Sequence, residues 1–121
     1  MAASGSVKLV MQLLGLSQEQ SFSDRFTLAN VPTLKVMDYR QQAVADTEET
    51  LDIGSLTNID CIVIKAITND MTVDPSFDTT YREGIVILEG EFAMFSPAGT
   101  VKIKNQDSAE QATYEYFIIG R

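Results

Sequence analysis

The feature that most constrains this chain is an alternation of apolar and polar residues with a period of two, interrupted at short intervals by turn residues. In the stretch SFSDRFTL, residues 21–28, Phe22, Phe26 and Leu28 share one side with Asp24, and the remaining residues are polar or charged. Because successive side chains of a strand point to opposite faces of a sheet, this pattern predicts a strand with one buried face.

Similar runs predict further strands at 7–13, 33–39, 47–53, 59–67, 84–95, 100–104 and 112–119, although 7–13 is also compatible with a short helix. Turn residues separate these runs, as in Asn30-Val31-Pro32, Gly54-Ser55, Thr68-Asn69-Asp70 and Asp74-Pro75. We therefore expect an all-β fold, an antiparallel β-sandwich or jelly roll of about eight strands in a single domain over residues 1–121. Helix is expected only for a turn or two, near 39–45 or 107–111.

The stretch EFAMFSPAGTVKIKN, residues 91–105, places two apolar runs on either side of a Ser-Pro-Ala-Gly turn. Pro97 presets the backbone angle of such a turn, and Gly99 lets the chain leave it in any direction. The sequence therefore predicts a β-hairpin whose strands pack through Phe92, Phe95, Val101 and Ile103. Gly90, just before this stretch, is expected to mark a bulge or a corner where a strand changes sheet.

The run CIVIKAI, residues 61–67, is apolar on both sides of the alternation and predicts a central strand. It holds Cys61, the chain's single cysteine, which cannot form an internal disulfide. With isoleucine and valine as neighbours, Cys61 is expected to be a buried hydrophobic residue and not a reactive thiol.

Composition excludes several classes of function. The chain has no histidine, so hydrolytic triads, zinc sites and Cys-His nucleophiles are excluded together. Seventeen acidic residues against nine basic ones give a net charge of -8, which disfavours nucleic acid as a partner. No apolar run approaches the length that spans a bilayer, so no membrane partner is expected.

Two acidic sets were the candidates for chemistry. Glu89 and Glu91 lie two residues apart, a spacing that could place a pair of carboxylates on one face of a strand for acid–base work, although two solvent-facing glutamates explain them better. The spacing of Asp70, Asp74 and Asp78 could gather oxygen ligands for calcium, but it matches no known calcium loop. The sequence thus predicts no enzyme, no metal site and no cofactor.

The last strand, ATYEYFIIG, is apolar on both faces. Such a strand at an open sheet edge needs a cover, and a partner chain is one natural cover, although the same residues could equally form an internal core. We therefore take the following residues of this strand as candidates for a subunit interface: Tyr114, Tyr116, Phe117, Ile118 and Ile119.

Residues 91–121 resemble small β-sandwich virion proteins of tailed bacteriophages, the kind that decorate a capsid or build a neck or tail ring. The resemblance covers about a quarter of the chain and rests on the Pro-Ala-Gly-Thr turn at 97–100, the Ile-Lys-Asn strand end at 103–105 and the aromatic last strand. It implies a structural role in a repeated assembly and assigns no residue to a known site.

The sequence and this resemblance together predict a noncatalytic virion structural subunit. Its expected partners are copies of itself in a homo-oligomer and other virion proteins, and its expected location is the virion, after synthesis in the host cytoplasm. The alternative is a β-sandwich module that binds a host-surface glycan. A cleft lined by exposed Tyr, Asn and Asp would favour this alternative.

Overall fold

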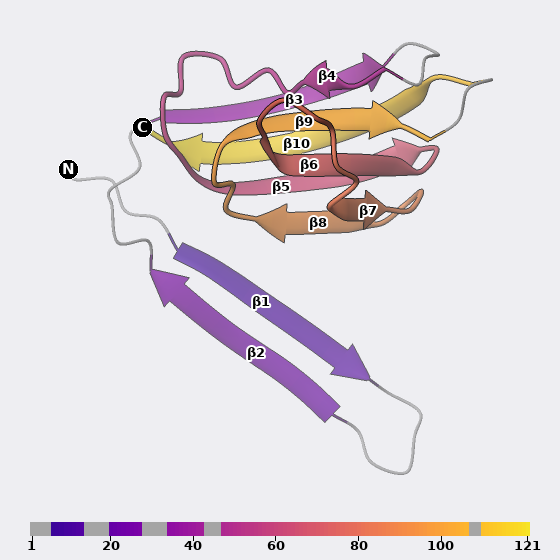
Figure 1. Cartoon of the computed structure of the whole chain (residues 1–121). Helices are drawn as coiled ribbons and strands as arrows, with labels where there is room; N and C mark the ends of the chain where they lie inside the picture. Colours follow the sequence, from indigo (N-terminus) through magenta and orange to yellow (C-terminus); the bar gives the residue numbers. More distant parts are fainter. Residues whose placement is uncertain (1–5, 14–19, 28–33, 43–46, 107–109) are drawn as a thin grey trace.

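The computed structural model describes residues 6–13, 20–27, 34–42, 47–106 and 110–121 (Figure 1). Within these ranges the chain forms ten strands and no helix, so the all-β prediction is confirmed, and no helix there is long and apolar enough to cross a membrane. The strands are β1 (Ser6–Leu13), β2 (Gln20–Thr27), β3 (Leu34–Gln42), β4 (Glu49–Thr50), β5 (Ile59–Thr68), β6 (Met71–Phe77), β7 (Ile85–Ile87), β8 (Phe92–Phe95), β9 (Thr100–Asn105) and β10 (Ala112–Gly120).

Eight of these strands form a jelly roll of two antiparallel sheets (Figure 1). The first sheet has the strand order β3-β10-β5-β8, and the second sheet has the order β4-β9-β6-β7. From β3 onward, consecutive strands change sheet at every connection except the one between β6 and β7. This alternation is the jelly-roll arrangement, one of the two forms that the sequence predicted.

The core lies between the two sheets and takes alternate residues from each strand. Ile62 and Ile64 of β5 and Ile118 of β10 contribute from the first sheet, and Val73 of β6 and Ile103 of β9 contribute from the second. These five side chains are completely buried. Each contributes about 1.5–3 kcal/mol relative to an exposed position, so the closed core is the main source of stability.

The other two strands, β1 and β2, pair with each other in a separate antiparallel hairpin. In Figure 1 the β1–β2 hairpin lies apart from the jelly roll. The strand interpretation of 7–13 is therefore confirmed and the helical one is wrong. Leu28, which the alternation placed at the end of the second of these strands, lies outside the described residues.

The prediction of a hairpin over 91–105 is wrong. β8 belongs to the first sheet, where it pairs with β5, and β9 belongs to the second, where it pairs with β4 and β6. Residues 96–99 therefore connect the two sheets. Four residues can extend about 13 Å, which is enough to cross the roughly 10 Å between packed sheets.

The predicted strand over 84–95 is two strands, β7 in the second sheet and β8 in the first. Gly90 lies between them with a φ of 83°, a left-handed conformation that favours glycine, and the predicted corner is confirmed. The predicted strand over 47–53 is shortened to Glu49–Thr50.

Strand β6 was missed because Asp74-Pro75 indicated a turn. The pairing of β6 with β9 shifts register between Asp74 and Phe77, and this irregularity accommodates a proline that has no N–H to donate. Of the predicted helical turns, residues 39–42 belong to β3, whereas 43–46 and 107–109 lie outside the described residues. Residues 110 and 111 are not helical.

Candidate functional site

The candidate interface residues of β10 lie on two faces of the first sheet. Tyr114, Tyr116 and Ile118 point into the core and are buried, whereas Phe117 and Ile119 lie on the opposite, outer face. The suggestion that this strand occupies an open edge is wrong, because β10 pairs with β3 on one side and β5 on the other. Any partner that contacts β10 in the folded protein therefore meets Phe117 and Ile119 and not the tyrosines.

The two tyrosines have a structural role in the core. Their rings are stacked with centroids 6.0 Å apart. The Tyr116 hydroxyl donates a hydrogen bond of 2.7 Å to the carbonyl oxygen of Asp52, in the segment that follows β4. Buried tyrosines usually find such a partner. This bond ties the first sheet to the chain segment leading into it, and the two rings offer no exposed stacking platform for a glycan.

The outer face of the first sheet carries a row of apolar residues. Met94 of β8, Val63 of β5 and Phe117 of β10 lie next to one another in register across three strands. Met94 and Phe117 are 36% and 40% exposed, and Phe92, in the neighbouring row beside Lys65, is 66% exposed. Large apolar side chains gathered on an open face are typical of a surface that contacts another molecule.

The exposure of Phe92 differs from the sequence interpretation, which packed Phe92 and Phe95 together. The two residues are three positions apart, so in one strand they must point to opposite faces. Phe95 packs against the core and Phe92 faces solvent. The period of two already contained this information, and it could have located the exposed face.

The β1–β2 hairpin is the second region with uncovered apolar side chains. Leu9, Val10 and Met11 are 37%, 53% and 63% exposed, and the described residues of β2, from Ser23 to Arg25, are exposed as well. No described side chain of the hairpin is buried. An isolated two-stranded hairpin is at best marginally stable in water, so this hairpin needs a surface on which to pack.

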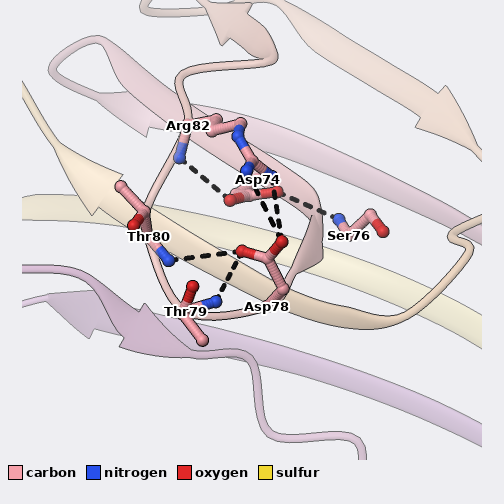
Figure 2. A network of polar contacts seen from close by, with 6 residues as sticks. All are labelled: Asp74, Ser76, Asp78, Thr79, Thr80 and Arg82. Carbon is pink, nitrogen blue, oxygen red and sulfur yellow. Dashed lines mark hydrogen bonds and ion pairs between the residues drawn. The ribbon is translucent and has the colours of Figure 1, made fainter.

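The aspartates of the suggested calcium loop bind backbone N–H groups (Figure 2). Buried Asp74 accepts hydrogen bonds from the N–H groups of Ser76 at 3.0 Å and Arg82 at 2.9 Å. Asp78 is exposed and accepts from the N–H groups of Thr79 and Thr80, which hold the pKa of its carboxyl below the ordinary value. These bonds fix the loop that follows β6.

The third aspartate of that set, Asp70, lies elsewhere and helps to fix the crossover from β5 to β6. Its carboxylate accepts the N–H of Glu89 at 2.8 Å, while the Glu89 carboxylate accepts the N–H of Asn69 at 3.0 Å. Asn69 has a φ of 65°, in the left-handed region, where asparagine is tolerated better than most residues. Glu89 therefore acts as a structural residue, and Glu91 is exposed beyond Gly90, before β8 begins.

A polar cluster covers part of the outer face of the second sheet. The Tyr81 hydroxyl lies 2.8 Å from the Thr72 hydroxyl, and the side-chain amide of Gln106 donates to the same Thr72 oxygen at 3.2 Å. Burial raises the pKa of Tyr81 to about 12, although its bond to Thr72 acts in the opposite direction. Lys104 lies 5.8 Å from the Tyr81 ring centre, at the outer limit for a cation–π contact. The second sheet thus carries a polar cluster beside exposed Val86, whereas the first sheet carries an apolar row across three strands.

Cys61 is buried, as the sequence predicted. Burial is the main cause that raises the pKa of its thiol, and the neighbouring Asp60 acts in the same direction. A raised pKa lowers the fraction of reactive thiolate, so Cys61 is a structural residue of the first sheet.

Comparison with known proteins found no matching family model, no similar curated protein and no similar solved structure. In the described part of the chain, no three acidic or cysteine residues are grouped so that they could hold a metal ion. The two apolar surfaces, on the hairpin and on the first sheet, are therefore the features on which a functional proposal can rest.

Proposed function

We propose that this chain is a noncatalytic structural subunit of a virion, which assembles with copies of itself and with other virion proteins as part of a capsid decoration, a neck or a tail. One observation carries the proposal: large apolar side chains are uncovered on two separate surfaces, the β1–β2 hairpin and the outer face of the first sheet. Both surfaces would lose unfavourable contact with water in an assembly.

The jelly roll supports this proposal at the level of fold. Viral capsid proteins and lectin domains both use eight-stranded jelly rolls, so the fold suits the virion proposal and also the glycan-binding alternative. The distribution of apolar side chains favours assembly. The glycan-binding alternative expects exposed tyrosines, whereas among the tyrosines with described side chains Tyr114 and Tyr116 are in the core and Tyr81 is half-buried and bonded to Thr72.

Each subunit would act by adding surface to its neighbours, without turnover. The acidic character fits a role that does not involve direct contact with nucleic acid, since a net charge of -8 repels phosphate groups. It also limits nonspecific association between copies. Assembly would then depend on the apolar surfaces and on local pairing of opposite charges.

Sedimentation velocity over a range of protein concentrations tests the proposal. We expect discrete oligomers whose population rises with concentration, and electron microscopy of these oligomers should show closed rings or regular clusters. Adding purified virions that lack the protein should deplete it from solution. A protein that stays monomeric, does not join particles and binds an oligosaccharide saturably would instead support the glycan-binding alternative.

A further inference from the structure

Two of the three exposed apolar residues described in the β1–β2 hairpin share one face. Leu9 and Met11 are two apart in β1 and therefore share one face, while Lys8 and Val10 occupy the other. The register places Leu9 opposite Asp24 of β2, so the face that carries Leu9 and Met11 also carries a negative charge. We call this the apolar face of the hairpin. Leu9, Met11 and Asp24 are all exposed.

The outer face of the first sheet has apolar and charged residues that could match those on the apolar face of the hairpin. Its apolar row of Met94, Val63 and Phe117 is followed by a row in which Phe92, Lys65 and Glu115 are neighbours in register. Lys65 is exposed and lies one residue pair away from the apolar row. The face that carries Leu9, Met11 and Asp24 can thus meet an apolar row beside which exposed Lys65 lies between Phe92 and Glu115.

The dimensions of the two surfaces also agree. Each strand of the hairpin has eight residues, about 26 Å at the usual rise, and β10 with nine residues measures about 30 Å. Two sheets that pack face to face bury side chains in the roughly 10 Å between them. The hairpin can therefore lie along the central strands of the first sheet as an additional layer.

We propose that the apolar face of the β1–β2 hairpin of one copy packs on the outer face of the first sheet of a second copy, with Asp24 beside Lys65. This inference rests on the proposed function and specifies how the subunits would join. In Figure 1 the hairpin lies apart from its own jelly roll.

The size of the contact determines the kind of assembly. The area of a face about 26 Å long and 10 Å wide is well below the roughly 800 Å² that each partner buries in a stable interface. This holds even though protruding side chains add to the area of the flat face. A single hairpin contact would therefore be weak. Each copy must give one hairpin and accept another, either reciprocally in a dimer or successively around a ring.

Cross-linking between two variants tests the contact. In a Cys61→Ala background, Met11→Cys protein is mixed with Phe117→Cys protein and oxidised, and the linked peptides are identified by mass spectrometry. We expect a disulfide that joins positions 11 and 117 of different chains. The matched control replaces Phe117→Cys with Val86→Cys, because Val86 is also exposed but belongs to the second sheet, and it should give at least tenfold less product.

A charge exchange provides the second test. Asp24→Lys alone and Lys65→Asp alone should each weaken association about three- to tenfold, because each places like charges together. The double variant Asp24→Lys/Lys65→Asp should recover most of the loss. Both positions are exposed, so the fold should be unchanged, and far-ultraviolet circular dichroism checks this.

The outcomes separate this inference from the proposed function. If oligomers form without the 11–117 link and the charge exchange gives no recovery, the hairpin contact is wrong while assembly stands. If the chain is monomeric at every concentration, the proposed function fails too. If a single chain carrying both Met11→Cys and Phe117→Cys links internally at high dilution as its main product, the hairpin covers its own sheet and the second copy is excluded.

Discussion

The β1–β2 hairpin and the jelly roll have the same kind of alternating sequence, but their apolar side chains differ in exposure to water. In both regions apolar and polar residues alternate along antiparallel strands. The apolar side of β5 and β10 is closed against the second sheet, whereas Leu9 and Met11 of β1 are exposed. This difference shows that alternation predicts a strand with one apolar face. It does not predict which part of the molecule, or which partner, covers that face.

Deleting a strand of the jelly roll and deleting the hairpin should therefore affect the unfolding transition differently. Deleting residues 112–121 takes out a central strand and several core side chains, so we expect the cooperative unfolding transition to disappear. Deleting residues 6–27 should leave that transition in place, because no described side chain in this range belongs to the core of the jelly roll. Thermal denaturation followed by circular dichroism measures both. Loss of the transition in the second deletion would show that the hairpin is part of the folding unit.

Replacing a single apolar residue by alanine should also destabilise the jelly roll more than the hairpin. Ile118→Ala empties a completely buried position and should lower the free energy of unfolding by about 2–5 kcal/mol. Leu9→Ala, at an exposed position of the hairpin, should change the free energy of unfolding of the monomer by less than about 0.5 kcal/mol. Urea denaturation at low protein concentration measures the two. Equal losses would contradict the view that the hairpin is uncovered.

The backbone of the jelly roll leaves no room for a side chain at Gly120. A Cβ added at Gly120 would lie 2.1 Å from the carbonyl oxygen of Asn58, beside the register shift between β10 and β5. Because backbone must move, Gly120→Ala should cost about 1–3 kcal/mol or more. At exposed Gly99 the nearest atom would be the Ser76 hydroxyl at 3.5 Å, an ordinary contact, so Gly99→Ala is the matched control and should be close to neutral. Similar effects at both positions would refute the steric argument.

A further effect is expected at alkaline pH, at Tyr81 in the jelly roll. The pKa of Tyr81 is raised from 10.0 to about 12, so the folded protein keeps the phenolic proton after the unfolded chain has lost it. Stability should therefore fall as the pH rises from about 10 to about 12 and then level off for this group. The difference between the wild type and Tyr81→Phe in urea denaturation across this range isolates the contribution. A difference that does not change with pH would contradict the raised pKa.

The sequence predicted the positions of the strands better than it predicted which strands pair with each other. β5 and β10 were located to within one residue because each is a long alternating run bounded by turn residues. The corner at Gly90 and the burial of Cys61 were also predictable, the first from glycine's conformational freedom and the second from its apolar neighbours. β6 was lost because the turn signal of Asp74-Pro75 outweighed a strand that accommodates proline through an irregularity in its pairing.

The candidate surface was only partly predictable for a related reason. The sequence selected β10, and within it Phe117 and Ile119 do lie on the outer face. Tyr114, Tyr116 and Ile118 were selected with them because the strand is apolar on both faces, and no pattern within a strand tells which of two apolar faces meets the second sheet. Phe92 and Met94 were missed because the sequence interpretation packed Phe92 with Phe95, although the period of two places them on opposite faces of β8.

What the sequence alone determined is local: an all-β chain, most of its strands, the turns at Gly54-Ser55 and Thr68-Asn69-Asp70, and the absence of histidine chemistry. The tertiary structure decided the rest, namely that residues 96–99 cross between sheets, that β10 is a central strand and that one outer face carries an apolar row. The physical reason is that alternation and turn propensity act over a few residues. The pairing of strands distant in sequence depends on which arrangement buries all the apolar faces together, and in this chain the hairpin and one sheet face are left uncovered.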